Sequence, residues 1–392
     1  MCASIDMADK KERQEAAAVR YGDMSLCILA GGQSRRMGRD KNWLPWMGSS
    51  FIEHLLDKAK KQGFREILLC VDETSIRWNM AASCCGARLV TDERSAYGPL
   101  EGLRRALSVM QSAYALVLSC DMPFFDFDRL APLREHVPEC MAAIPVAGGR
   151  QQFLAGVYSK WLLPYVEQAI EAGGHSLYGV LHGKAPVAFV DMTSAAAHFF
   201  NVNTPAAYRL ALGRAMNLER RVPVVSVTAM HSNSGKTTFI ERLLPFLAER
   251  GLRAGVVKSD VHALKLDAEG TDSFRFMEAG AQAVAVVSDG QLLLLQRTQR
   301  EKDLLAAAQR MQEVDLVFIE SRAHGAAPRL EILPEGESLL RPENELAALV
   351  SSGGRKCAGL LQFSAEDTEA AYAVVCFLIG REDGSDRLFT LD

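Results

Sequence analysis

The stretch LAGGQSRRMGRDK, residues Leu29 to Lys41, decides the fold class of the first half of this chain. It follows a short, almost wholly apolar run, Ser25 to Ala30, which is typical of a strand buried on both faces of a parallel sheet. Gly31 and Gly32 permit positive φ and place no Cβ between the backbone and a ligand, so successive N–H groups can converge on phosphate oxygens. Four basic side chains follow in the loop: Arg35, Arg36, Arg39 and Lys41. The stretch favours a loop that binds a phosphorylated nucleotide, with an exposed basic turn as the alternative.

The residues around this loop alternate between short apolar runs and helix-compatible stretches. The apolar runs are 67–71, 115–120 and 142–146, and the helix-compatible stretches include 51–62 and 100–110. This alternation predicts an α/β domain with a doubly wound parallel sheet.

Acidic residues follow several of the predicted strands. Asp72, Asp92 and Asp121 would all lie with Gly31 beyond the carboxyl ends of the strands, where such sheets bind ligands. A single acid at this position is usually a turn or a helix cap, but several at one edge indicate a site. Mg²⁺ is commonly held by one or two carboxylates together with phosphates, and Asp121 is the strongest candidate for that role.

The loop and four later motifs resemble one known family. LAGG-x-S-x-RMG-x-DK is similar to the signature of small nucleotidyltransferases, and in this form to that of the molybdenum cofactor guanylyltransferases, the MobA family. Its fixed positions are all present: Leu29, Ala30, Gly31, Gly32, Ser34, Arg36, Met37, Gly38, Asp40 and Lys41. The likeness continues through Asp92, Gly98-Pro99-Leu100 with Gly102, Cys120-Asp121-Met122-Pro123, and Asn201-Val202-Asn203-Thr204-Pro205, and so covers about residues 22–210.

The resemblance implies the roles of the residues at this site. Leu29, Ala30, Gly31, Gly32, Lys41, Asp92 and Asp121 would bind GTP. Arg36, Lys41 and Asp121 would be catalytic, with Asp121 on Mg²⁺ and the two cations on phosphate charge. A terminal phosphate of the second substrate would attack the α-phosphorus, so positioning and electrostatics would carry the chemistry.

The sequence leaves two roles in this half undecided, that of Asp72 and that of several amide side chains. Asp72, also placed in the nucleotide site, stands where relatives often have Asn, and an ionised carboxylate cannot donate to a base carbonyl. Amide side chains that could hold a pterin edge occur in segments similar to the family's substrate side, but Asn-Thr-Pro is also a good turn and helix start. These amides are Gln151, Gln152, Asn201 and Asn203.

The second half begins with another strand, loop and helix. After a charged cluster, the apolar run Val222 to Ala229 leads into MHSNSGKTTFIERLLPFLAERG. The segment Ser234-Gly235-Lys236-Thr237-Thr238 matches the end of a P-loop, in which Lys236 would reach the β- and γ-phosphates and Thr237 would bind Mg²⁺. The helix predicted over 236–250 has one apolar face, and Pro245 is expected to disturb its hydrogen bonds.

The P-loop match is incomplete. Met230 stands where the standard motif has glycine, so a positive φ there would be costly, and Asn233 replaces another glycine of similar proteins. We therefore expect nucleotide binding at this loop, with weak GTP hydrolysis.

Residues further along resemble the MobB adaptor GTPase. They are Lys258, Asp267, Gly270, Asp272, Ser273, Arg275 and Glu278-Ala279-Gly280-Ala281. The run Asp315 to Glu320 is similar to the second phosphate-side strand, which implies that Glu320 binds magnesium through water. Ser259 stands where this family commonly has histidine, so no role of that histidine is carried over. The likeness spans about residues 223–380.

Composition agrees with two globular domains. The chain has 392 residues, 48% hydrophobic and 23% charged, with a formal net charge of −4. This charge argues against a general nucleic-acid binder. Nine cysteines without a C-x-x-C pair, no stretch of signal-peptide character and no apolar run of membrane-spanning length favour a cytoplasmic protein.

The sequence thus predicts two doubly wound α/β domains, a Rossmann-like nucleotidyltransferase and a P-loop NTPase. The expected boundaries are a polar extension 1–21, a transferase domain 22–210, a linker 211–222 and an adaptor domain 223–392. The expected reaction joins GMP from Mg-GTP to molybdenum-carrying molybdopterin and releases pyrophosphate, while the second domain binds GTP and assists cofactor handling. The expected partners are molybdenum-insertion proteins and recipient molybdoenzymes, with no membrane. The alternatives are a cytidylyltransferase that uses CTP, a second domain that docks without hydrolysis, and a sugar or isoprenoid nucleotidyltransferase.

Overall fold

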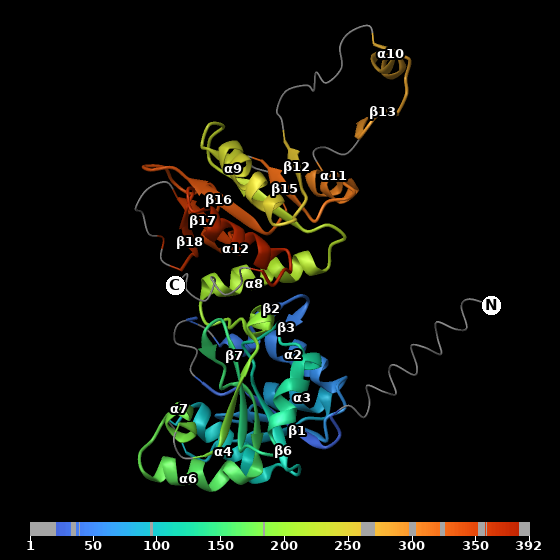
Figure 1. Ribbon diagram of the computed structural model, residues 1–392. Helices are drawn as coiled ribbons and strands as arrows, with labels where there is room; N and C mark the ends of the chain where they lie inside the picture. Colours follow the sequence, from blue (N-terminus) through green and yellow to red (C-terminus); the bar gives the residue numbers. More distant parts are fainter. Residues whose placement is uncertain are drawn as a thin grey trace, which may run out of the picture. The chain divides into compact units, whose positions relative to one another are not determined.

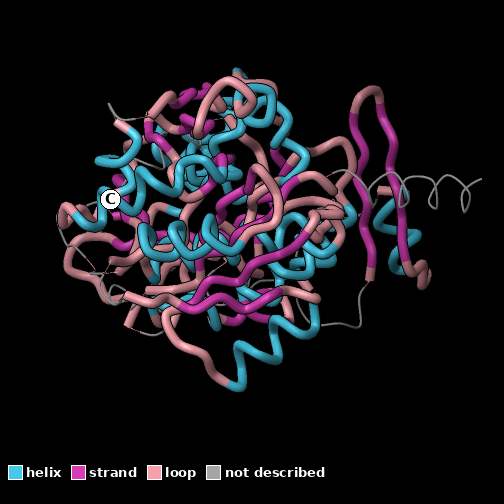
Figure 2. Tube along the Cα trace, turned by 90° about the horizontal axis from the view of Figure 1, so that it is seen from below, coloured by secondary structure: helices cyan, strands magenta, loops and turns pink. Residues whose placement is uncertain are grey.

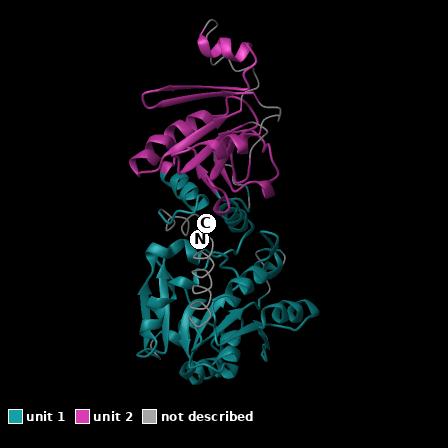
Figure 3. Ribbon diagram, turned by 90° about the vertical axis from the view of Figure 1, so that its right-hand side faces the viewer, with its two compact units in different colours: residues 1–216, 357–361, 369–392 teal, residues 217–356, 362–368 magenta. Residues whose placement is uncertain are grey.

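The computed structural model describes residues 21–32, 37–38, 40–94, 97–182, 185–259, 271–297, 303–321, 326–351, 357 and 359–383. The chain forms two compact units, shown in Figure 3. Unit 1 comprises residues 1–216, 357–361 and 369–392, and unit 2 comprises 217–356 and 362–368. The domain boundaries expected from the sequence describe segments that would each fold independently. The division into compact units does not test this, so these boundaries stay a prediction.

Unit 1 contains an eight-stranded sheet with the order β10-β7-β9-β6-β1-β4-β5, and β8 pairs with β7. Its strands are β1 (Met24–Leu29), β4 (Glu66–Val71), β5 (Arg88–Thr91), β6 (Tyr114–Ser119), β7 (Ala142–Ala147), β8 (Arg150–Gln151), β9 (Ala155–Ser159) and β10 (Val187–Asp191). A small hairpin pairs β2 (Pro45–Trp46) with β3 (Ser49–Ser50). The central strand β1 runs parallel to β4 and β6, as predicted. In contrast, β9 runs antiparallel to both β6 and β7, so the sheet is mixed.

The helices of unit 1 lie between these strands along the chain, except α8 and α12, which follow the last of them (Figure 1). They are α2 (Phe51–Lys60), α3 (Ile76–Cys85), α4 (Pro99–Val109), α5 (Ala131–His136), α6 (Leu163–Glu171), α7 (Leu177–Leu181), α8 (Pro205–Leu218) and α12 (Thr368–Leu378), with short 3-10 turns η1 (Lys41–Trp43), η2 (Phe127–Leu130), η3 (Lys160–Leu162) and η4 (Thr193–Phe199). Helix α2 begins with a capping box, in which the Ser50 hydroxyl accepts from the Glu53 amide and Glu53 accepts from the Ser50 amide.

Two hydrophobic clusters cover the sheet of unit 1. Leu26 and Ile28 of β1 belong to one cluster, whereas Cys27 and Leu29 belong to the other. Because side chains alternate along a strand, both faces of β1 are buried, which explains why its sequence is a continuous apolar run.

Unit 2 contains a six-stranded parallel sheet with the order β12-β15-β11-β16-β17-β18. Its strands are β11 (Val224–Thr228), β12 (Ala254–Lys258), β15 (Leu316–Glu320), β16 (Arg329–Leu333), β17 (Ala348–Ser351) and β18 (Gln362–Ser364), and its helices are α9 (Lys236–Glu249), α10 (Asp272–Glu278) and α11 (Leu304–Arg310), with the 3-10 turn η5 (Glu343–Glu345). Helix α9 continues through Pro245. The fold class predicted for both halves is confirmed.

A separate antiparallel pair completes unit 2. Strands β13 (Ala283–Ser288) and β14 (Gln291–Gln296) turn at Asp289-Gly290, where Gly290 has a φ of 73°. The two strands lie side by side in Figure 2.

The last helix, α12, is part of unit 1 although its sequence follows β18 of unit 2. The ring of Phe377 lies 4.5 Å from that of Phe200 and 5.9 Å from that of Phe124, measured between centroids. The buried Arg214 of α8 donates from Nη1 to the Phe377 carbonyl at 2.8 Å. Its remaining bonds go to the carbonyls of Gly380 and Arg381, which follow the helix end. The Arg214 guanidinium thus holds the end of α12 on unit 1, together with the contacts of Glu382 with Arg129 and His198.

We expect Arg214→Met to destabilise unit 1 by about 2–4 kcal/mol, because buried helix-end carbonyls lose their donor. Burial lowers the pKa of Arg214 to about 10, so the side chain stays charged at neutral pH. Thermal unfolding followed by circular dichroism should show a melting temperature lower by roughly 5–10 °C. The exposed Arg65→Met is the matched control. An equal melting temperature in both variants would contradict the role given to Arg214.

Candidate functional site

The first candidate site lies where β1 and β6 end. Lys41 follows the loop after β1, and Asp121 follows β6, which pairs with β1 in parallel register. Lys41 Nζ donates to Asp121 Oδ2 at 2.7 Å. Burial alone would lower the pKa of Lys41, but the Asp121 carboxylate outweighs it and the pKa is raised. The sheet therefore brings together two residues that are 80 positions apart in sequence.

Asp121 has one oxygen without a partner among the described residues. The residue is 5% exposed, and its Oδ1 atom is buried and receives no hydrogen bond. An orphaned carboxylate oxygen is costly in a folded protein and is a suitable ligand for Mg²⁺, which prefers hard oxygen donors. The donor set thus fits the metal that the sequence predicted at Asp121.

Asn42 is a site residue that the sequence analysis missed. It is 2% exposed, and its Nδ2 donates to the Ala30 carbonyl and to Asp40 Oδ1, both at 2.8 Å. These bonds tie the end of the loop to the end of β1. The sequence did carry a signal, because Asn42 is a lone amide in the otherwise apolar run after Lys41. An amide in such a run is expected to be buried, and a buried amide must be hydrogen-bonded.

Asp72 and Asp92 lie on the other side of β1, at the ends of β4 and β5. Asp72 Oδ2 accepts from the Gly32 amide at 2.8 Å. A Cβ on Gly31 would lie 2.2 Å from Asp72 Oδ1, so only glycine allows this approach. Burial, followed by the like charges of nearby Asp72 and Glu101, raises the pKa of Asp92 to about 7.

A buried ion network fixes the chain after Asp92. The fully buried Glu101 accepts from Arg104 Nε and Nη2, both at 2.8 Å, and its Oε1 also accepts from the Glu93 amide at 3.1 Å. Arg104 Nη2 lies 2.6 Å from Glu93 Oε2. The network therefore holds residues 93 and 101 together, and with them the entry to α4.

The remaining predicted residues of this half differ in their surroundings. Ala30 and Leu29 are buried in and after β1, whereas Gly31 and Gly32 are exposed. Arg36, predicted to be catalytic, lies outside the described residues.

The predicted pterin-side amides fall into two groups. The Val202 amide donates to the Asp121 carbonyl at 2.8 Å, which places the segment of Asn201 and Asn203 beside Asp121. Gln152 is 7% exposed and Gln151 contacts His182 Nε2 at 3.2 Å. Of the predicted amides, Asn201 and Asn203 thus lie in a segment bonded to Asp121.

The second candidate site is the loop between β11 and α9. Lys236 is buried, and its Nζ donates to the carbonyls of His231 at 2.7 Å and Ser232 at 3.4 Å. Thr237 Oγ1 donates to Glu320 Oε1 at 2.8 Å, because β15 pairs with β11 and ends at Glu320. Ser234 is buried, whereas Thr238 is exposed on the first turn of α9. A hydroxyl and a carboxylate in contact at a helix start fit the Mg²⁺ predicted for Thr237 and Glu320.

Met230 does not adopt the positive φ that would be costly for it. In the loop 229–235, all of which is described, only Gly235 has a positive φ, of 87°. Neither Met230 nor Asn233 therefore has the positive φ that favours glycine.

The other residues that resemble MobB are only partly described. Lys258 Nζ lies 3.9 Å from Glu320 Oε1, beside the P-loop. Asp272 and Arg275 form an exposed pair on α10, whereas Asp267 and Gly270 lie outside the described residues.

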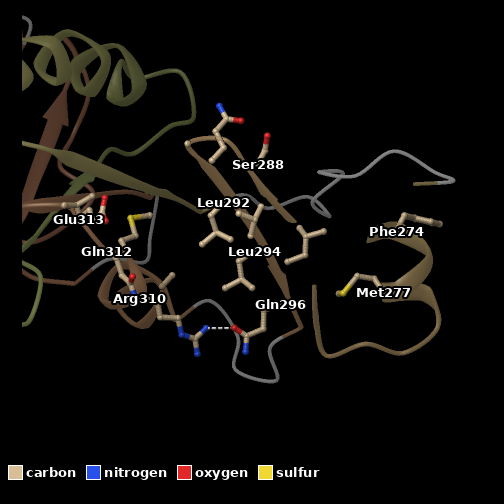
Figure 4. Close-up of a pocket in the computed structure, with 16 residues that line it drawn as sticks. Phe274, Met277, Ser288, Leu292, Leu294, Gln296, Arg310, Gln312 and Glu313 are labelled. Carbon is tan, nitrogen blue, oxygen red and sulfur yellow. Dashed lines mark hydrogen bonds between the residues drawn. The ribbon is translucent and has the colours of Figure 1, made fainter. Parts of the chain in front are cut away.

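Figure 4 shows a pocket in unit 2 between the β13–β14 hairpin, α10 and α11. Leu292 and Leu294 of the hairpin and Met277 of α10 line it, and Arg310 donates to Gln296 Oε1 at 3.0 Å. The pocket is therefore mainly apolar and differs in chemistry from the two phosphate-side loops.

Among the residues that the structure describes, no group of three or more His, Cys, Asp or Glu side chains could hold a metal on its own. No helix in this described part is both long enough and apolar enough to span a membrane.

Comparison with known proteins agrees with both halves. Residues 26–186 match the MobA-like NTP transferase domain, and residues 224–352 match molybdopterin guanine dinucleotide synthesis protein B. The fold and the loop define a nucleotidyltransferase joined to a MobB domain. The chain belongs to the molybdenum cofactor guanylyltransferase family, which confirms the resemblance.

Individual relatives illustrate the match. The molybdenum cofactor guanylyltransferase of Shewanella sp. (strain MR-4) is 33% identical over 184 residues, which are 45% of this chain and 89% of that protein. That of Pseudomonas putida is also 33% identical, over 46% of this chain and 93% of its own length. Among solved structures, Bacillus subtilis MobB is 30% identical over 40% of this chain and 99% of its own, with a TM-score of 0.34.

Proposed function

We propose that the first domain transfers GMP from Mg-GTP to molybdenum-carrying molybdopterin, forming the guanine dinucleotide cofactor and releasing pyrophosphate. The Lys41–Asp121 pair, with its orphaned carboxylate oxygen, is the observation that carries this proposal. The family membership supports GTP and molybdopterin as the two substrates.

The proposed reaction is an in-line substitution at the α-phosphorus. A terminal phosphate oxygen of molybdopterin forms the new P–O bond while the bond from the α-phosphorus to the bridging oxygen breaks, and pyrophosphate leaves with that electron pair. Lys41 stabilises the charge on the phosphates, and the loop amides after β1 hold them. Asp121 would hold Mg²⁺, which offsets negative charge when bound. Asn201 and Asn203, beside Asp121, are the amides proposed to orient the pterin.

The direct test supplies the purified protein with molybdenum-loaded molybdopterin and each Mg-NTP in turn, and measures pyrophosphate. We expect release with GTP. No release with GTP, or faster release with CTP, would contradict the guanylyl proposal and favour a cytidylyltransferase.

For the second domain we propose GTP binding with Mg²⁺ at Thr237 and Glu320, in support of cofactor handling in the cytoplasm. The partners we propose are molybdenum-insertion proteins and recipient molybdoenzymes. A second candidate function for this domain is docking to a partner without GTP hydrolysis. The Lys236 ammonium donates to two carbonyls of its own loop, and it must break these hydrogen bonds to reach a phosphate. This arrangement favours the docking function. Steady phosphate release from GTP would support hydrolysis, and binding without release would support docking.

A further inference from the structure

Two bridges join the turn η1, which follows the loop of β1, to the end of β6. The first is the ion pair in which Lys41 Nζ donates to Asp121 Oδ2 at 2.7 Å. The second joins the residues next to them in sequence, because the Cys120 thiol donates to Asn42 Oδ1. Strands β1 and β6 are parallel neighbours in the sheet, so both bridges lie at its carboxyl edge.

Both polar atoms of the Asn42 side chain have partners. Nδ2 donates to the Ala30 carbonyl and to Asp40 Oδ1, both at 2.8 Å, and Oδ1 accepts from the Cys120 thiol. The three partners belong to the end of β1, the end of the loop and the end of β6. A neutral amide supplies two donors and an acceptor, whereas a carboxylate could not donate to either oxygen. Asn42 therefore holds three segments of the site together without adding a charge.

The two bridges differ in charge and in burial. Asn42 and Cys120 are 2% and 1% exposed, whereas the Lys41 side chain is 18% exposed. Under the proposed function, the Lys41 ammonium leaves the charged bridge to meet phosphate, and an Asp121 oxygen turns to Mg²⁺. The neutral bridge has no such competitor, because both of its members are buried. It can therefore persist while the charged bridge is exchanged for ligand.

Resting on the proposed nucleotidyl transfer, we propose that Asn42 and Cys120 are positioning residues that keep Lys41 and Asp121 in register while these two bind Mg-GTP. They act through their sequence neighbours and do not contact the ligand themselves. Misplacing a reacting group by about 1 Å can cost about 100-fold in rate. Loss of the neutral bridge should therefore slow the reaction although every group that contacts the ligand remains.

The test compares Cys120→Ala with Cys120→Ser in the full chain. Alanine removes the donor of the neutral bridge, whereas serine retains one. With molybdenum-loaded molybdopterin and Mg-GTP, we expect Cys120→Ala to lower kcat for pyrophosphate release about tenfold and Cys120→Ser to stay within about threefold of wild type. The matched control is Cys27→Ala, which removes a fully buried thiol of β1 outside the bridge and should keep the wild-type kcat.

A second readout does not depend on turnover. The dissociation constant of GTP is measured with and without Mg²⁺ in chains that also carry Lys236→Ala, introduced to leave one GTP site. Without Mg²⁺, Cys120→Ala should bind GTP within about twofold of its parent chain, because Asn42 still holds the Ala30 carbonyl. The gain in affinity on adding Mg²⁺ should shrink about threefold or more, and Cys120→Ser should restore it.

Asn42→Ala should have a larger effect than Cys120→Ala, because it also releases the Ala30 carbonyl and Asp40. We expect kcat to fall about 100-fold. Rates are measured well below the melting temperature of each variant, so that a loss of folded protein is not read as a loss of rate. A kcat near that of wild type in folded Asn42→Ala would contradict the role given to this amide.

Equal kcat in wild type and Cys120→Ala, or equal losses in the alanine and serine variants, would overturn the inference. An unchanged Mg²⁺ effect on GTP affinity in Cys120→Ala would do the same. Failure of the proposed function would look different, because the wild-type chain itself would release no pyrophosphate with any Mg-NTP. The Mg²⁺ dependence of GTP affinity would still test the bridge in that case.

Discussion

Asp121→Asn is expected to lower GTP-dependent pyrophosphate release by about two to three orders of magnitude. The amide keeps the shape of the side chain but removes the charge that pairs with Lys41 at 2.7 Å and the oxygen proposed to bind Mg²⁺. GTP binding measured without Mg²⁺ should change far less than the rate, because the loop amides remain.

The control for Asp121→Asn is Glu135→Gln, which removes an exposed carboxylate elsewhere in unit 1. Both variants should be checked by circular dichroism, because Asp121 is buried and its replacement leaves the Lys41 ammonium without its carboxylate partner. Full activity of a folded Asp121→Asn protein would show that the reaction centre lies elsewhere.

Lys236→Ala is expected to reduce the number of GTP molecules bound per chain from two to one. The buried ammonium is the group proposed to meet the β- and γ-phosphates, and truncating a buried charged partner costs about 2–5 kcal/mol, roughly 30-fold or more in affinity. Isothermal titration of the full chain with Mg-GTP measures this number directly.

Ser232→Ala alters the same loop without removing a charge and should still bind two GTP molecules. Pyrophosphate release with molybdopterin should persist in Lys236→Ala, since the proposed transfer uses Lys41. If the variant still binds two GTP molecules, the P-loop is not a nucleotide site.

The sequence was sufficient to predict the fold class and to place the first loop and Asp121 at one edge of the sheet. Buried parallel strands are continuous apolar runs, and the residues that follow neighbouring strands meet at one edge of the sheet. The order and direction of the strands could not be predicted from the sequence. The run 155–159 forms the antiparallel strand β9, but it is buried like its neighbours β6 and β7 and so has no distinguishing pattern.

Side-chain contacts between neighbouring strands of the sheet were also not predicted. The contact of Asp72 with the Gly32 amide depends on β4 lying next to β1, which no local pattern specifies. The departure of Met230 from the glycine of the standard motif brings no positive φ at that residue, and the loop has its positive φ at Gly235. Asn42 was missed because its role depends on burial beneath the loop.

The position of α12 has a consequence for synthesis on the ribosome. Residues 1–216 emerge first, but the helix that covers Phe124, Phe200 and Arg214 is translated only after the whole of unit 2. At roughly 5–20 residues per second, the delay for 152 residues, counted from 217 to 368, is about 8–30 s. During that interval an aromatic patch of the nascent transferase stays open to solvent, so chaperone binding to stalled chains should depend on whether translation has passed residue 378.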